Sequence, residues 1–336
     1  MYGDLNRDRT CDPHPVKMVL SQLSYQVLIV TQVLVYQGIE QLSNGFVKAI
    51  VISLGIEKRT IVTEIILILL VCGVVAGTVG SLVGLGGGVI IVPVLLYLGS
   101  TSESFEVTPQ IAVGTSLLVI AFSSLSSSIS YFRQSKVDFR SALLFFTASG
   151  PGAIVGAFIN NRMSGGAFLI GFGTFMIAVS FLLMMRGRWK KRNTEWSVTR
   201  TYHDTITNEH LTYGYTRKVA LTVSFAVGIL AGMFGVGGGA LMMPVMLLLF
   251  HFPVHIAAAT SMFMIFLSSI PGSITHGLYG NINWIFVIAL APGAWIGGQF
   301  GAYLSTKLKT RTLIIGLRAM LVLTGIRLIW TGMLDI

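Results

Sequence analysis

The chain has 336 residues, of which 53% are apolar and only 11% are charged, whereas a soluble domain carries about 25% charged residues. Together with a mean hydropathy of +0.78, this excludes a cytosolic enzyme, a disordered chain and a disulfide-rich secreted domain. The net charge of +10 comes from basic residues in short stretches between apolar runs, which is the pattern of the positive-inside rule and not of a nucleic-acid-binding face. We therefore expect a multi-pass protein of the cytoplasmic (cell) membrane that contacts the lipid bilayer and binds no nucleic acid.

Residues 1–60 form an N-terminal extension to which we assign no function. It contains two apolar stretches, 27–36 and 46–56, and each is too short for a membrane span, which needs about 20 apolar residues. It also lacks an apolar region followed by a small-residue cleavage site. We predict that this extension is poorly structured.

Ten apolar segments follow in two sets of five, within residues 61–185 and 219–336. In each set the second segment is too short to cross a membrane comfortably, and it follows a triple glycine. The segments lie at about 64–83, 88–99, 111–132, 140–160, 165–185, 219–234, 239–250, 256–277, 283–304 and 311–332. We predict an all-α polytopic membrane protein with about eight to ten segments, of which the short pair are half-helices or re-entrant.

A hydrophilic stretch at 186–218 separates the two sets. It holds eight Lys or Arg residues and three acidic residues, and five of the basic residues fall in 186–192, directly after an apolar segment. We predict a cytoplasmic linker that fixes the orientation of the chain. A regulatory contact or a contact with anionic lipid is the alternative.

The two sets are copies of one repeat. The run Gly84–Pro93 (GLGGGVIIVP) matches Gly235–Pro244 (GVGGGALMMP) at an offset of 151 residues. Two shorter motifs recur in the same order, Gly114-Thr-Ser with Ala259-Thr-Ser and Pro151-Gly-Ala with Pro292-Gly-Ala. Because the order is kept and the offset drifts little, chance is a poor explanation.

The charges of the loops indicate that the second copy is inverted. Loop 133–140 carries three basic residues and its counterpart 278–283 carries none, whereas 305–312 carries three against one in 161–164. Basic loops exchange places in this way when one copy is upside down. Inverted repeats of this kind recur in secondary transporters. Loop 100–109, with two glutamates and no cation, is then external.

The triple glycines mark the expected binding site. Each glycine costs a helix up to about 1 kcal/mol, and a broken backbone is tolerated in a bilayer only inside protein or along a watery cavity. Broken segments at matching positions of both halves point to a transporter's binding site, and a helix N-terminus suits an anion. Close helix packing is the alternative. The glycines assigned to substrate binding are Gly86, Gly87, Gly88, Gly237, Gly238 and Gly239.

Four hydroxyl groups and two ionisable side chains complete the candidate site. Thr115, Ser116, Thr260 and Ser261 stand near the starts of apolar segments, where they either donate to an oxyanion or form bonds between helices. The two ionisable candidates for contact with an anion are His276 and Arg318, which both lie within apolar segments. For both, packing between helices is the alternative.

With the duplicated G-x-G-G-G…P run, the T-S pair and the P-G-A motif, the chain resembles the TauE/SafE family of sulfite exporters from about residue 62 to 333. The resemblance implies two related halves in the bacterial cytoplasmic membrane and export of sulfite or an organosulfonate such as sulfoacetate. We expect a secondary transporter for a small anion that works by alternating access around a midplane site. The sequence does not indicate an oligomeric state.

Other classes fit the sequence less well. The alternative is a transporter or channel for another small solute, an organic acid or a metal ion. A metal carrier needs a cluster of Asp, Glu, His or Cys, and the apolar segments offer only isolated His276 and Cys72. No HExxH motif and no acid pair within one segment occur, so we expect no enzyme, no catalytic residue, no metal site and no cofactor. A purely structural membrane protein would not need the duplicated breaks.

Overall fold

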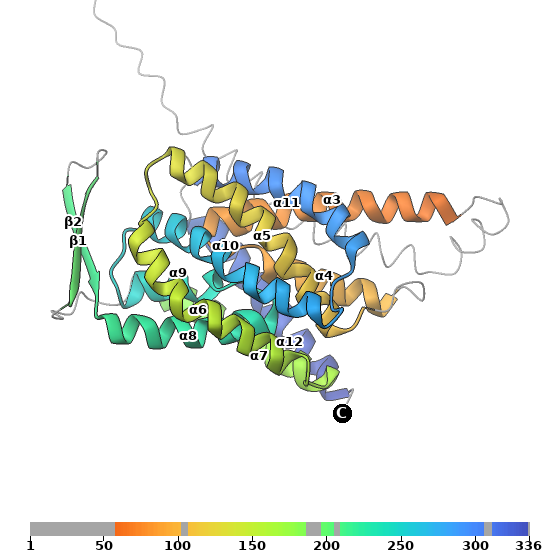
Figure 1. Ribbon diagram of the computed structural model, residues 1–336. Helices are drawn as coiled ribbons and strands as arrows, with labels where there is room; N and C mark the ends of the chain where they lie inside the picture. Colours follow the sequence, from red (N-terminus) through yellow and green to blue (C-terminus); the bar gives the residue numbers. More distant parts are fainter. Residues whose placement is uncertain (1–57, 102–106, 186–195, 205–208, 306–310, 335–336) are drawn as a thin grey trace, which may run out of the picture.

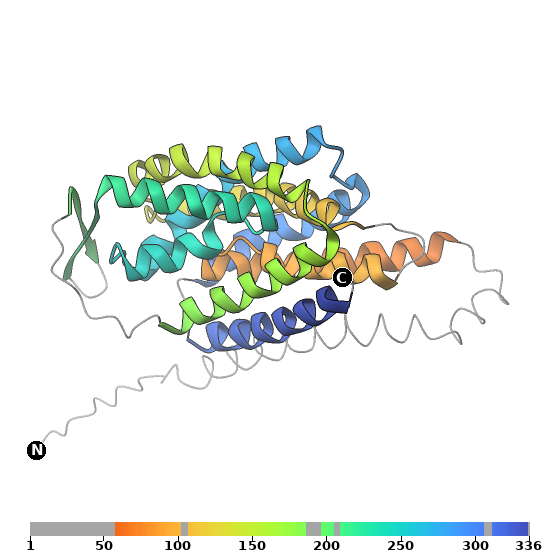
Figure 2. The same cartoon turned by 90° about the horizontal axis from the view of Figure 1, so that it is seen from below.

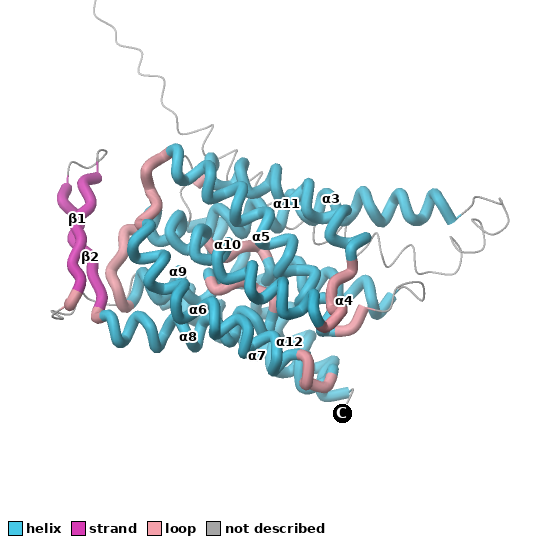
Figure 3. Tube along the Cα trace, viewed as in Figure 1, coloured by secondary structure: helices cyan, strands magenta, loops and turns pink. Residues whose placement is uncertain are grey.

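The computed structural model describes residues 58–101, 107–185, 196–204, 209–305 and 311–334. These ranges form a bundle of ten helices with one β-hairpin at its end (Figures 1 and 3). Eight of the helices in these described ranges are long and apolar enough to cross a membrane. The elements are α3 (Lys58–Val83), α4 (Gly88–Thr101), α5 (Pro109–Arg133), α6 (Phe139–Asn160), α7 (Gly165–Met185), β1 (Val198–Asp204), β2 (Glu209–Tyr215), α8 (Arg217–Phe234), α9 (Gly239–Leu248), α10 (Val254–Leu278), α11 (Trp284–Leu304) and α12 (Arg311–Leu334).

The predicted all-α polytopic fold is confirmed. The two short helices are those expected after the triple glycines, α4 with 14 residues and α9 with 10 residues. The predicted extension 1–60 lies outside the described residues up to residue 57.

The hairpin is the element that the sequence analysis missed. Strand β1 pairs antiparallel with β2, with Val198 opposite Tyr215, inside the stretch 186–218 that we expected to be a plain linker. We judged this stretch by its charges and overlooked a run rich in Thr and Tyr, which are residues that favour strands. The hairpin stands at the end of the bundle where α5 leads into α6 (Figure 1).

The first and fourth helices of opposite halves pack together through glycines. Gly73 of α3 faces Leu290 of α11, and Gly77 faces Ala294, so these helices run parallel. Their equivalents repeat the arrangement, because Gly228 of α8 lies against Ser149 of α6. A Cβ atom on Gly228 would lie 2.3 Å from the Ser149 carbonyl oxygen, so glycine allows an approach that no other residue permits. Each half therefore completes its packing with the other half.

Equivalent helices of the two halves run in opposite directions. Gly114 of α5 lies against His276 of α10, while Leu117 lies against Gly272, so these two helices are antiparallel. The pair α7 and α12 is also antiparallel, since Gly173 faces Gly325 and Gly166 faces Gly332. Helices α7 and α12 lie side by side along one edge of the bundle (Figure 2), and α5 and α10 lie near its centre (Figure 1).

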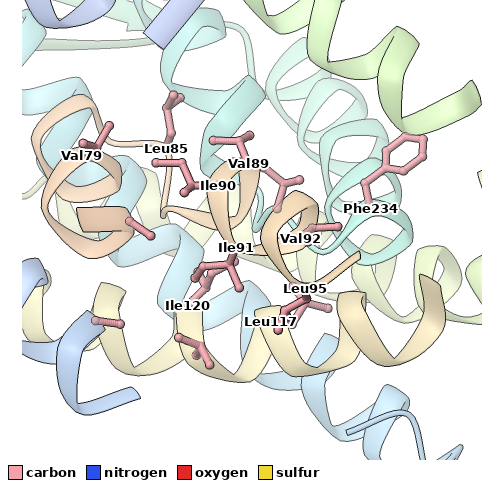
Figure 4. Close-up of a cluster of buried hydrophobic side chains, with 14 of the residues drawn as sticks. Val79, Leu85, Val89, Ile90, Ile91, Val92, Leu95, Leu117, Ile120 and Phe234 are labelled. Atoms are coloured by element: carbon pink, nitrogen blue, oxygen red, sulfur yellow. The ribbon is translucent and has the colours of Figure 1, made fainter. Parts of the chain in front are cut away.

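The short helix α4 lies inside the protein and not on its lipid-facing surface. Its side chains Val92 and Leu95 are fully buried, and they belong to the main hydrophobic core together with Leu117 and Ile120 of α5. Figure 4 shows Ile91 beside Ile120 and Leu95 beside Leu117. A helix enclosed in this way keeps its broken backbone away from lipid, as the bilayer requires.

Candidate functional site

The two glycine turns cross at the centre of the bundle. Gly84 and Gly235 begin the turns with φ values of +79° and +69°, a left-handed conformation that glycine adopts without strain. A Cβ atom on Gly88 would lie 2.5 Å from the Gly235 carbonyl oxygen, and one on Gly239 would lie 2.8 Å from the Gly84 carbonyl oxygen. The structure thus brings the two predicted triplets together, backbone against backbone.

The two serines of the T-S motifs join the halves at this crossing. Ser116 of α5 donates its hydroxyl hydrogen to the carbonyl oxygen of Gly235. Ser261 of α10 donates in the same way to the carbonyl oxygen of Gly84, at 2.9 Å. Each half therefore binds the glycine turn of the other half with an equivalent residue.

The threonines form a second reciprocal pair of hydrogen bonds. Thr115 accepts a hydrogen bond from the backbone N–H of Asn283 at 3.0 Å, and Thr260 accepts one from the backbone N–H of Asp138 at 3.1 Å. Both threonines are fully buried, as are Ser116 and Ser261. In this conformation the four hydroxyls connect helices, so an anion would reach them only after these bonds open.

His276 occupies a position equivalent to Tyr131. The Nε2 atom of His276 lies 3.1 Å from the carbonyl oxygen of Gly232 on α8, and the Tyr131 hydroxyl donates to the carbonyl oxygen of Ser81 on α3 at 2.9 Å. Ser81 and Gly232 are themselves equivalent, three residues before Gly84 and Gly235. Among the described residues, the Nδ1 atom of His276 is buried without a hydrogen-bond partner. The histidine therefore lies close to the turn of the second half.

Arg318 lies on α12 and contacts α7. Its guanidinium Nη2 donates to the carbonyl oxygen of Leu183, and its own carbonyl oxygen accepts from Ser180. The helix pair α7–α12 forms an edge of the bundle (Figure 2). The structure therefore places Arg318 on this pair and not beside the glycine turns.

Asp138 is an important residue that the sequence analysis did not single out. Its Oδ1 atom accepts from the Ser141 N–H at 3.2 Å and so caps α6. Its Oδ2 atom lies 3.2 Å from the Nε of Arg200 and accepts from the Tyr213 hydroxyl at 3.2 Å. Burial, and then the nearby carboxylate, raise the pKa of Tyr213. The sequence feature that could have identified Asp138 is that it is the single acidic residue among the basic residues of loop 133–140.

Aromatic side chains fix the hairpin to the end of α9. Tyr213 and Tyr215 of β2 are buried against Phe250 and Phe252, which follow α9, and against Phe145 of α6. The backbone N–H of Gly214 donates to the Phe250 carbonyl oxygen at 3.2 Å. The hairpin therefore touches both the cap of α6 and the far end of the short helix that begins at the second glycine turn.

Comparisons with known proteins agree with this architecture. The sequence model of the family described as "Sulfite exporter TauE/SafE" matches residues 69–328. A Bacillus subtilis protein named "Probable membrane transporter protein YunE" is 47% identical over 79% of this chain and 97% of its own length. A "Probable membrane transporter protein" of Xylella fastidiosa (strain Temecula1) is 28% identical over 69% of this chain and 83% of its own length. No solved structure matches the chain. The chain is therefore a multi-pass transporter of the cell membrane and belongs to the sulfite exporter TauE/SafE family.

Proposed function

We propose that this transporter exports a small anion, sulfite or an organosulfonate, by alternating access around the crossing of the two glycine turns. The observation that carries the proposal is the reciprocal contact of these turns, in which a backbone carbonyl of each half lies against a glycine of the other. The family description supports a sulfur oxyanion as the cargo.

The chemistry of the crossing suits an anion. The first N–H groups of a helix have no partner within the helix, and the helix dipole makes this end positive. Helices α4 and α9 both begin at the crossing, and the N-cap residue of α9, Gly238, brings no side chain to cap those N–H groups. The neighbouring hydroxyls of Ser116 and Ser261 can donate to an oxyanion without adding charge to the membrane interior.

The antiparallel direction of equivalent helices supports the inverted repeat. Two inverted halves that hold each other by matching bonds have two equivalent ways to part, one on each side of the membrane. Opening the Ser116–Gly235 bond would release one turn, and opening the Ser261–Gly84 bond would release the other. An inside-negative potential then favours anion exit by about 2.3 kcal/mol per charge per 100 mV.

The test places a fixed negative charge at the crossing. Gly238 has a φ of −58°, and a Cβ atom there would lie no closer than 3.4 Å to its neighbours, so the backbone and the first side-chain atom allow a substitution. We expect Gly238→Asp to abolish efflux of labelled sulfite from proteoliposomes, whereas Gly238→Asn, which has the same shape without the charge, keeps most of it.

Two outcomes would contradict the proposal. The first is equal sulfite flux through the Asp and Asn variants, which would remove the anion from the α9 N-terminus. The second is a wild-type protein that passes a labelled dicarboxylic acid but neither sulfite nor sulfoacetate. An imposed inside-negative potential should also raise efflux, and an unchanged rate would exclude electrogenic export.

A further inference from the structure

Two isoleucines fill the space beside both glycine turns. Ile120 and Ile265 are equivalent residues at the offset of 145 that relates the T-S motifs. Each lies near the middle of its helix, Ile120 in α5 and Ile265 in α10, and both are fully buried. The two helices that carry the T-S motifs therefore also carry a matched pair of branched apolar side chains.

Each isoleucine reaches the turn of its own half and the turn of the other half. A Cβ atom on Gly86 would lie 3.2 Å from both Ile120 Cγ2 and Ile265 Cδ1. A Cβ atom on Gly237 would lie 2.8 Å from Ile265 Cγ2 and 3.3 Å from Ile120 Cγ2. The two side chains thus meet at the same place, where α4 and α9 begin.

Buried apolar side chains at this place oppose the entry of an ion. A hydrated anion that moved against two buried isoleucines would lose water without gaining a hydrogen-bond partner. Apolar constrictions of this kind exclude water and ions until they widen. Ile120 packs on Ile91 of α4 (Figure 4), so the hydrophobic core restricts the movement of its side chain.

We propose that Ile120 and Ile265 form the constriction of the transport path and set the size of the anion that passes. The inference rests on the proposed function, because it needs a path through the glycine crossing. As α5 and α10 move apart, the two side chains separate, and the space that opens between them admits the cargo. Shortening either side chain widens that space.

The experiment compares alanine variants in proteoliposomes loaded with labelled sulfite, with labelled sulfoacetate or with nitrate. The variants are Ile120→Ala, Ile265→Ala and the pair. The matched control is Ile288→Ala on α11, because this side chain is 72% exposed in the protein and lies away from the core. We expect a several-fold larger nitrate leak and a several-fold rise in the sulfoacetate-to-sulfite rate ratio for the pair, smaller rises for the single variants, and none for the control.

The outcomes separate the constriction from the proposed function. If the wild type passes no sulfur anion and yet the pair leaks nitrate, the constriction stands and the export proposal fails. If the wild type exports sulfite and the pair keeps the wild-type rate ratio and nitrate tightness, the constriction is wrong. If the double alanine variant does not fold, the double variant Ile120→Val and Ile265→Val makes the same test. An unchanged sulfoacetate-to-sulfite rate ratio in that variant also contradicts the inference.

Discussion

The two halves form equivalent hydrogen bonds, but they differ in what contacts the first turn of the fourth helix, which is α6 in one half and α11 in the other. In the first half, Asp138 caps α6 and holds the hairpin through Arg200 and Tyr213. In the second half, its equivalent Asn283 caps α11 by accepting from two backbone N–H groups, at 3.1 and 3.3 Å. The cap is thus kept in both halves, and the charge that recruits the hairpin is present in only one.

Other equivalent positions repeat this pattern of a shared backbone and a different side chain. Tyr131 and His276 both bond the carbonyl three residues before a glycine turn. Gly87 has a φ of +87° whereas Gly238 has a φ of −58°, so Gly238 accepts a side chain without backbone strain and Gly87 does not. The comparison teaches that the backbone contacts joining the halves are shared, whereas the side chains at equivalent positions differ, both inside the bundle and at the hairpin.

The largest expected effect comes from breaking the shared framework. Gly88→Val and Gly239→Val would each press a Cβ atom on a carbonyl oxygen of the other half. We expect each to lower the free energy of unfolding by about 3 kcal/mol or more, the upper range for overpacking. Thermal unfolding in detergent measures it. Gly165→Val is the control, because a Cβ atom there meets nothing within 4 Å. A small effect at only one of the two glycines would show that the framework is not symmetric.

The next effect tests the difference between the caps. Asp138→Asn keeps a capping side chain but leaves Arg200 without its carboxylate, and we expect a loss of about 1.5–3 kcal/mol, as for a hydrogen bond to a charged group. Limited proteolysis of the hairpin should quicken accordingly. Asn283→Asp should change stability by less than about 0.5 kcal/mol, since Asp and Asn cap helices about equally well. Equal losses in both variants would contradict the proposed asymmetry.

A smaller, matched effect is expected at the two serines. Ser116→Ala and Ser261→Ala each remove one hydrogen bond between the halves, so each should cost about 1 kcal/mol. The unfolding midpoints of the two variants should agree closely. Clearly unequal midpoints would show that the two turns are not held in the same way.

The smallest effect is the pH dependence of the hairpin. Because the pKa of Tyr213 is raised in the folded protein, its contribution is complete below the ordinary tyrosine pKa of about 10 and is lost as the pH rises through the folded value. Proteolysis of the hairpin should therefore quicken above about pH 10. Tyr213→Phe should weaken this dependence, and an unchanged pH profile in that variant would refute the assignment.

The sequence predicted the helices well because long apolar runs and triple glycines are local signals. It also assigned both glycine turns to one binding site, because a broken backbone in the bilayer interior must be buried in protein or line a watery cavity. It could not show that Ser116 bonds the Gly235 carbonyl, because such a contact depends on how α5 packs against the other half. The hairpin was missed for a related reason. Its buried Tyr215 has aromatic partners in Phe145 and Phe250, far away in the chain.

The pairing of α3 with α11 has a consequence for biosynthesis. The Ser81 hydroxyl of α3 donates to the carbonyl oxygen of Gly298, which follows it by 217 residues. A ribosome therefore releases α3 into the membrane long before the helix that covers its glycine face exists. Until α8, α11 and α12 are inserted, the glycine faces of the first half remain uncovered in the bilayer. A chain truncated before α11 should therefore be recognised as incomplete by membrane quality control and degraded.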